Sequence, residues 1–307
     1  MKTPIIIDTD PGIDDVIAIT AALFAEELDV KLITTVGGNV GIENTTRNAV
    51  NLVNFLGKGT PVAKGAAQPL LNKLVNASFV HGESGVGGYR FEEKENATVL
   101  STRHAVEEMK ELILHSAEPV TLVPIGPLTN VALLLRMYPE TKSNIKEIVL
   151  MGGAAQGGNR TPVAEFNIFA DPHAAKIVFD EQIKIVMCGL DVTRLTSITT
   201  ENIREVEGFG KVGDMVSRLL SDYDSTTSSH NHVTIHDLCA VFYLTRPEIF
   251  KGKRATVNVV TEGEASGCTV THYTEDGHVF VCLDADVEEF RREFVSTFKK
   301  AYEKMEG

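Results

Sequence analysis

Four aspartates stand within eight residues near the start of this 307-residue chain. They are Asp8, Asp10, Asp14 and Asp15. An apolar run, Ile5–Ile7, precedes them, and Pro11-Gly12 marks a turn among them. An apolar run that stops at a turn is typical of a buried strand, which places the acids at its carboxyl end and in the first turn of the next element. Two carboxylates ~4 Å apart repel by ~4 kcal/mol at an effective dielectric constant near 20. A hard divalent cation, which prefers oxygen ligands, would offset that repulsion. The alternative is a solvated acidic turn that favours a helix N-terminus.

Further polar side chains follow later apolar runs. They lie at Asn39, Gly126–Asn130, Gly152–Asn159, Glu165–Asn167, Asp191 and His236-Asp237. Each alone has an ordinary reading as a turn residue, a solvated loop or a helix start. In an open α/β sheet, however, ligands bind beyond the carboxyl ends of the strands, so their common placement favours one site. Amides and carboxylates suit the hydroxyls of a polyol, and a cation can bind a vicinal diol and a water together. No Lys, Arg or glycine loop is arranged for phosphate, which disfavours a phosphorylated substrate.

Strand-like and helix-like patterns alternate over the first two thirds of the chain. The strand-like runs are Pro4–Asp8, Val30–Val36, Val120–Ile125, Ile145–Met151 and Ile183–Cys188. The helix-like patterns are Ile13–Ala25, Ile42–Leu56, Leu128–Met137 and Ala174–Glu181. This alternation predicts an α/β fold with an open, mostly parallel sheet flanked by helices. The glycine fingerprint of dinucleotide-binding folds is missing after the first run.

The last third predicts further helices, a polar loop and short strands. The helical patterns are Ile203–Leu220, His236–Arg246 and Val287–Lys304, and the β-like runs are Thr256–Thr261, Thr269–Tyr273 and Val279–Leu283. Between the first two helices, Asp222–Thr234 is rich in Ser, Thr and His and is long enough to be functional or mobile. No linker or repeat divides the chain, so we expect a single domain over residues 1–307.

Composition excludes several classes of protein. The net charge is −13 and no Lys/Arg cluster stands out, which disfavours nucleic acid as a partner. The four cysteines are far apart among apolar or small neighbours, which favours buried free thiols over a zinc site or disulfides. We find no signal peptide and no membrane-spanning segment, and therefore expect no membrane contact and a cytoplasmic location.

The longer motifs resemble those of the inosine–uridine-preferring nucleoside hydrolases. The matching segments are Asp8–Asp15, Thr35–Val40, His81–Glu83, Gly126–Asn130, Met151–Gly153, Ala164–Asn167 and His236-Asp237. The resemblance covers essentially the whole chain. The order and spacing are most similar to the broad-specificity bacterial members of the C type.

The resemblance implies a role for each matched position. Ca²⁺ would be held by the carboxylates of Asp10, Asp15 and Asp237 and by the backbone carbonyl of Ile125, with Asp8 supporting the site from close by. Asp10 would also take a proton from the metal-bound water. The ribose would be gripped by Asp14, Asn39, Asn159, Glu165 and Asn167, with Met151 beneath the sugar. His81 and His236 would face the base, His236 being the better candidate to protonate the leaving group. The ligands would be small ribonucleosides, and the resemblance implies a homo-oligomer, either a dimer or a tetramer.

Physical chemistry supports this division of roles. Cleavage of an N-glycosidic bond develops positive charge on the ribose ring, as in glycoside hydrolysis. Carboxylates and amide oxygens around the ring stabilise that charge. A bound cation makes water a better nucleophile, and a proton donor helps a poor leaving group depart.

One departure leaves the base preference open. Family members of narrower specificity often place a Tyr in the loop before the His-Asp pair, whereas residues 226–232 hold no aromatic residue and Tyr223 lies at the near end. We therefore expect broad use of purines and pyrimidines. Two alternatives remain. One is a non-catalytic nucleoside or ribose sensor. The other is a haloacid-dehalogenase-like phosphatase using Asp8-Thr9-Asp10, although Gly12 stands where that motif needs Thr or Val.

Overall fold

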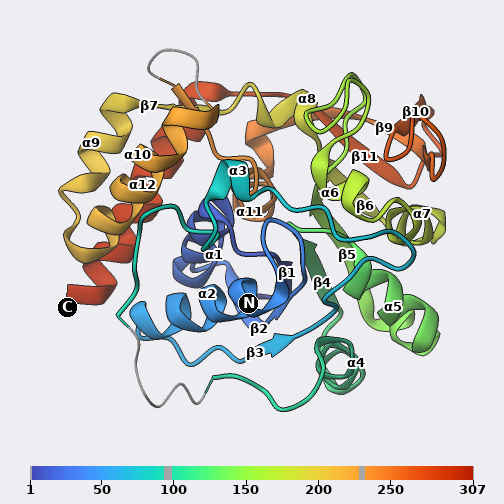
Figure 1. Cartoon of the computed structure of the whole chain (residues 1–307), viewed down its shortest axis with the longest axis horizontal. Helices are drawn as coiled ribbons and strands as arrows, with labels where there is room; N and C mark the ends of the chain where they lie inside the picture. The colour runs from blue at the N-terminus through green and yellow to red at the C-terminus, as the bar shows by residue number, and fades with distance from the viewer. Residues whose placement is uncertain (1, 93–98, 228–231, 307) are drawn as a thin grey trace.

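The computed structural model describes residues 2–92, 99–227 and 232–306, and in these residues nine strands form one sheet (Figure 1). Along the sheet the strand order is β10-β9-β11-β6-β5-β4-β1-β2-β3. The strands are β1 (Thr3–Thr9), β2 (Leu28–Thr35), β3 (Val62–Lys64), β4 (Val120–Pro124), β5 (Ile145–Met151), β6 (Ile185–Cys188), β9 (Phe250–Val259), β10 (Thr269–Tyr273) and β11 (Val279–Ala285). The strands from β3 to β11 in this order pair in parallel, while β9 pairs antiparallel with β11 and β10. The predicted fold class is therefore confirmed.

Helices cover both faces of this sheet. They are α1 (Ile13–Phe24), α2 (Ile42–Phe55), α3 (Ser78–His81), α4 (Ala105–His115), α5 (Thr129–Met137), α6 (Phe166–Ala170), α7 (Pro172–Asp180), α8 (Leu190–Thr193), α9 (Thr200–Glu207), α10 (Gly210–Thr227), α11 (Leu238–Thr245) and α12 (Val287–Glu306). In Figure 1, α9, α10 and α12 lie together on one side, and α4, α5 and α7 lie on the other. Successive residues of β1 divide between the two cores, because side chains alternate across a strand. Ile5 and Ile7 pack with α1, α2 and α10–α12, while Ile6 packs with α4, α5 and α7.

The direction in which successive strands are added to the sheet reverses at β1. After β1 the chain builds β2 and β3 on one side, then returns to β4, β5 and β6 on the other. A crevice forms where such connections diverge, at the carboxyl ends of the strands. The segment that follows β1, which carries the clustered aspartates, therefore begins at this switch point.

Two predictions for the segment before His236 are wrong. The helix predicted over Ile203–Leu220 is two helices, α9 and α10, and α10 begins at Gly210, which has a φ of +57°. The predicted loop Asp222–Thr234 is helical to Thr227 and ends in strand β8 (His232–Thr234), which pairs with β7 (Ser197–Thr199). Residues 228–231 lie outside the described residues. Burial of Leu219, Leu220 and Tyr223 continues α10 through a sequence of weak helix propensity.

Some elements were not predicted from the sequence. The main one is α4, which buries Val106, Met109 and Ile113. Their spacing of three and four residues is the helical signal that would have found it. The short α3 and β3 are too brief to leave a periodic pattern. The helix predicted over His236–Arg246 begins later than expected. It is α11, which starts at Leu238, so His236 precedes the helix and Asp237 is its N-cap residue.

All four cysteines are free thiols. Cys188, Cys239 and Cys282 are buried as predicted, whereas Cys268 is only half-buried because it lies in the turn before the edge strand β10. Of the helices in the described residues, none combines the length and the apolar character needed to cross a membrane.

Candidate active site

A cavity of about 360 Å³ opens at the carboxyl ends of the parallel strands. Every predicted site residue except Asp10 and Asp15 lines it. Those lining residues are Asp14, Asn39, His81, Ile125, Met151, Asn159, Glu165, Asn167, His236 and Asp237. Asp10 and Asp15 lie fully buried in the same segment as Asp14. Residues from six separate parts of the sequence therefore meet at the edge of the sheet that the sequence indicated.

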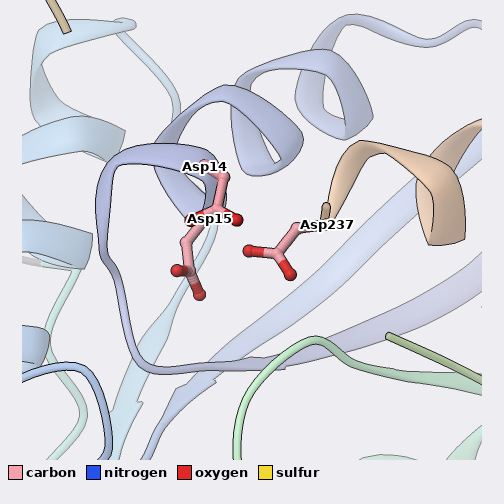
Figure 2. Close-up of side chains that lie close together, drawn as sticks. All are labelled: Asp14, Asp15 and Asp237. Atoms are coloured by element: carbon pink, nitrogen blue, oxygen red, sulfur yellow. The ribbon is translucent and has the colours of Figure 1, made fainter. Parts of the chain in front are cut away.

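Three carboxylates converge at one end of this cavity, here named the carboxylate end. Figure 2 shows Asp14 and Asp15 projecting from the first turn of α1 toward Asp237 at the start of α11. Each offers an oxygen, and these three atoms lie within 4.8 Å of one another. The N-terminus of α1 favours negative charge, which partly offsets the repulsion. Asp14, expected to bind ribose, thus belongs to the same group as two expected metal ligands, while Asp10 lies outside this group of three.

Asp15 is held by four hydrogen-bond donors. Its Oδ1 accepts from the Thr9 hydroxyl at 2.5 Å and from the Asp10 amide at 3.3 Å. Its Oδ2 accepts from the Gly12 amide at 2.9 Å and from Asn39 Nδ2 at 3.0 Å. These donors hold the carboxylate in one orientation.

Asp10 differs from Asp15 because one of its oxygens is left over. Oδ2 accepts from the Asn39 amide at 2.6 Å, whereas Oδ1 is buried and has no hydrogen-bond partner among the described residues. Gly38 and Gly126 flank this carboxylate, and a Cβ atom at either position would overlap its oxygens. Glycine is therefore required at both positions for the Asp10 carboxylate to occupy this place.

Burial and mutual repulsion raise the pKa values of the carboxyl groups at the carboxylate end. Burial, and then the charge of Asp15, raises the pKa of Asp10 well above its ordinary value. Burial, and then the charge of Asp14, does the same to the pKa of Asp237. Burial also raises the pKa of Asp14 and of Asp15 to about 6. Such a group strongly favours a bound cation, since the cation would offset both the desolvation and the repulsion.

Asp8 lies beneath this cluster and outside the cavity lining. Its Oδ1 accepts from the Thr34 hydroxyl at 2.6 Å and from Asn130 Nδ2 at 2.8 Å. Burial raises the pKa of Asp8 to about 7, and its Oδ2 has no partner among the described residues. A nucleophile must reach the substrate, so this position argues against the phosphatase alternative.

The wall next to the carboxylate end carries the polar groups expected to bind ribose. Glu165 caps α6, with Oε1 accepting from the Asn167 amide at 2.9 Å and Oε2 from the amides of Gly153 and Ile168 at 2.9 and 3.2 Å. Burial raises the pKa of Glu165 to about 7. One acceptor position of Oε1 remains, so Glu165 can still receive a hydroxyl. The reading of Glu165 as a solvated loop residue is wrong, since its side chain is buried.

Two asparagines complete this wall. Asn167 Nδ2 donates to the carbonyl oxygens of Ile125 at 3.1 Å and Met151 at 3.2 Å. A carbonyl oxygen has two lone pairs, so the Ile125 oxygen keeps one for another partner. Asn159 Oδ1 accepts from the Phe166 amide at 2.9 Å, which ties the exposed loop to α6.

Two histidines also line the cavity, and the part of the wall that they form is here named the histidine end. His81 Nδ1 accepts from the Ile13 amide at 3.1 Å, and its ring stacks on Tyr223 with centroids 5.5 Å apart. His236 Nδ1 lies 2.7 Å from the Thr193 hydroxyl oxygen. Burial lowers the pKa of both histidines to about 4, so both rings are neutral at pH 7. An N–H group can only donate, so the neutral His81 ring carries its proton on Nε2.

Sequence reasoning missed several residues of the lining. Tyr223 was noted only as the end of a loop, yet it is buried, lines the cavity and donates from its hydroxyl to Asp14 Oδ2 at 3.5 Å. Phe79, which is 68% exposed, also lines the cavity. Arg160 and Arg194 lie there too, although the sequence suggested no arginine near the site. The position of Arg160 directly after Asn159 was the available signal for the first of these.

Fold and site together define an α/β protein with a polar cavity built beside a buried carboxylate cluster. Residues 5–292 match the family model of the inosine-uridine preferring nucleoside hydrolases, and the chain belongs to this family. The chain is 47% identical over 297 residues to the non-specific ribonucleoside hydrolase RihC of Klebsiella pneumoniae, covering 95% of this chain and 97% of that protein. The corresponding Escherichia coli protein gives the same identity and coverage.

Solved structures agree with this assignment. A purine-preferring ribonucleoside hydrolase from Gardnerella vaginalis superimposes with a TM-score of 0.91 at 29% identity, covering 98% of this chain and 99% of that one. A plant nucleoside hydrolase gives a TM-score of 0.89 at 28% identity, with coverage of 97% and 99%. The predictions of a nucleoside hydrolase and of similarity to the C type are confirmed.

Proposed function

We propose that this protein hydrolyses the N-glycosidic bond of purine and pyrimidine ribonucleosides, giving ribose and the free base. One observation carries the proposal: a single cavity is lined by buried carboxylates, two histidines and amide side chains. Its volume of about 360 Å³ suits a small molecule. The relatives named non-specific ribonucleoside hydrolases support the broad choice of base.

The carboxylate end fits a resident Ca²⁺. The leftover Oδ1 of Asp10 and the raised pKa values of the cluster are the features that a hard cation would satisfy. We assign the cation to the carboxylates of Asp10, Asp15 and Asp237 and the carbonyl of Ile125. When bound, the ion would supply positive charge that binds hydroxyls and makes water more acidic. Asp8 would support this site from below through its contacts to Thr34 and Asn130.

Asp10 is the proposed general base. Its Oδ2 is fixed by the Asn39 amide, so Oδ1 has a defined direction and is free to accept a proton from the attacking water. Its raised pKa favours that acceptance. Asn39 donates from its backbone amide to Asp10 and from Nδ2 to Asp15, so the same residue would hold both acids in place during the reaction.

The polar wall would bind the sugar. Asp14, Asn39, Asn159, Glu165 and Asn167 face the cavity and offer the oxygens and amide groups that ribose hydroxyls need, with Met151 against the ring. Positive charge develops on the ring as the bond breaks, so oxygens held in place beforehand stabilise the transition state more than the ground state.

The histidine end would serve the leaving base. His81 presents Nε2–H, because its Nδ1 is occupied by the Ile13 amide. His236 is the proposed proton donor to the base: its protonated ring would give the Nε2 proton to the base and return to the neutral form, with His81 as a second hydrogen-bond donor. The stack of His81 on Tyr223 would keep that ring in place.

The decisive experiment is a panel of ribonucleosides assayed for free ribose and free base, with and without added phosphate. We expect release of ribose from inosine and uridine alike, independent of phosphate, and slow reaction of the 2′-deoxyribonucleosides. A site built for a hydroxyl loses several kcal/mol when that hydroxyl is absent. Ribose 1-phosphate as the product would instead show a phosphorylase, and binding without turnover would show a sensor.

The assembly and location of the protein are also part of this proposal. We expect a cytoplasmic homo-oligomer, a dimer or a tetramer, on the basis of the family resemblance. Light scattering coupled to size-exclusion chromatography measures the oligomer directly, and a monomeric mass at assay concentration would contradict it.

A further inference from the structure

A short segment beside the cavity, Asp191–Arg194, contacts two parts of the cavity wall, the loop that carries Asn159 and the ring of His236. Asp191 accepts from the amides of Ala155 at 2.7 Å and Gln156 at 3.0 Å, and Arg194 donates to the carbonyl of Gly158 at 2.6 Å. These bonds hold the loop that supplies Asn159. Two residues after Asp191, the Thr193 hydroxyl meets His236. The segment includes most of α8, which follows strand β6 of the central sheet, so its position is fixed by the fold.

The contact between Thr193 and His236 determines which ring nitrogen is available. Thr193 is fully buried, and its hydroxyl oxygen lies 2.7 Å from Nδ1. With Nδ1 engaged, Nε2 is the nitrogen that remains for a ligand in the cavity that His236 lines. The hydrogen bond at one imidazole nitrogen sets the tautomer and the orientation of the ring.

The two histidines differ in the kind of partner at Nδ1. For His81 the partner is the Ile13 amide, which can only donate. For His236 it is a hydroxyl, which can either donate or accept. The hydroxyl can therefore accept from an Nδ1–H group and hold the ring while Nε2 faces the ligand, whereas the His81 Nδ1 accepts from an amide and carries no proton.

We propose that Thr193 is a positioning residue that acts through His236: its hydroxyl at Nδ1 holds the ring so that Nε2 serves the departing base. This inference rests on the proposed function, in which His236 assists the leaving group. Thr193 itself contacts neither sugar nor base, so its effect should depend on how much the leaving group needs a proton.

Three variants test the inference. Thr193→Val removes the hydroxyl at nearly constant shape, and Thr193→Ser restores it. Thr196→Val is the matched control, because the Thr196 hydroxyl is also buried and bonds to the Thr193 carbonyl at 3.0 Å and to Cys239 Sγ at 3.0 Å, with no contact to His236. Each is assayed on inosine and on 4-nitrophenyl riboside, whose leaving group departs as a stable anion. Thermal melting and bound metal are measured in parallel.

We expect Thr193→Val to lower kcat on inosine by about 10-fold, the effect of one lost hydrogen bond to a working side chain, with KM little changed. The nitrophenyl substrate should react at near wild-type rate. Thr193→Ser should recover most of the inosine activity, and Thr196→Val should leave the ratio of the two rates unchanged.

Equal loss on both substrates, or no loss on inosine, would overturn the role of Thr193. The proposed function fails separately. If wild-type protein does not hydrolyse inosine, or if His236→Ala shows no preference between the two substrates, the assignment of His236 is wrong. If His236→Ala does show that preference and Thr193→Val does not, only the inference about Thr193 fails.

Discussion

The two ends of the cavity are assembled in different ways. The carboxylate end comes largely from one continuous segment, and Asp15 is fixed by donors that include Thr9 and Gly12, within six residues of it. The histidine end is brought together from distant elements: α3 carries His81, α10 carries Tyr223, and His236 precedes α11. The proposed cation site is thus encoded largely within one segment, whereas the proposed surroundings of the base depend on how distant elements pack.

The largest effect should come from the carboxylate end. Asp10→Asn keeps the shape but removes both the proposed base and a metal ligand, so turnover of inosine should fall by about 10³-fold or more. The control is Asp180→Asn on the exposed face of α7, which should react normally. Retention of more than a tenth of the wild-type kcat would exclude Asp10 as the base.

The histidine end should show its effect on only one kind of substrate. His236→Ala should slow inosine hydrolysis by ~10²–10⁴-fold, the usual contribution of general acid catalysis. Hydrolysis of 4-nitrophenyl riboside should stay near the wild-type rate, since the carboxylate end is intact. Parallel kinetics on the two substrates decide this, and an equal loss would assign His236 the structural task of placing Asp237.

The carboxylate end should also be coupled to stability through the metal. Asp15→Ala leaves its buried donors unpaired, at about 1–3 kcal/mol each, and removes a ligand. We expect loss of bound Ca²⁺ together with a lower melting temperature. Elemental analysis and thermal melting with and without added Ca²⁺ are the measurements. Full Ca²⁺ occupancy in this variant would contradict the ligand assignment, and active wild-type protein free of divalent metal would contradict the site altogether.

Metal-free protein should reveal opposite pH dependences at the two ends. The raised pKa values belong to Asp14 and Asp15, at about 6, and to Asp8 and Glu165, at about 7. These groups bind protons more tightly in the folded state, so their contribution to stability is full below their ordinary pKa of 3.8–4.5 and is lost as pH rises to about 7. His81 and His236 act oppositely: their contribution is full above pH 6.5 and is lost as pH falls toward 4.

Carboxyl groups outnumber the histidines, so stability without metal should fall between about pH 4 and about pH 7, by an amount on the order of a few kcal/mol. Chemical denaturation after chelation measures this. Added Ca²⁺ should restore stability most strongly at the higher pH, where the carboxylates are ionised. A stability that rises with pH in the chelated protein would mean that the histidines dominate.

The smallest effect should come from Tyr223. Tyr223→Phe keeps the stack on His81 and removes a hydroxyl whose bond to Asp14, at 3.5 Å, is long. We expect kcat/KM to change by less than about 5-fold, equally for inosine and uridine. Tyr223→Ala, which removes the stack, should cost more. A strong preference of Tyr223→Phe for one base would show that the hydroxyl contacts the base directly.

The same contrast explains what could be predicted from sequence. The strands and the residues at their carboxyl ends were predictable, because an apolar run, a turn and an acid are local signals. The hydrogen bonds that hold Asp15 and the unpartnered oxygen of Asp10 could not be predicted, since they depend on where Asn39 and Gly126 lie in space. The continuation of α10 and the place of Tyr223 were missed for a related reason, namely that burial outweighed weak local helix propensity.

The central position of β1 has a consequence for local motion. This strand pairs on both sides, and its side chains are packed into both cores. Its amide hydrogens can therefore exchange with solvent only when the sheet itself opens, whereas α3 is a single turn with one buried side chain. Hydrogen exchange should accordingly be slow along β1 and much faster in α3. The aspartates that follow β1 should then stay in place for as long as the molecule stays folded, while the position of His81 fluctuates.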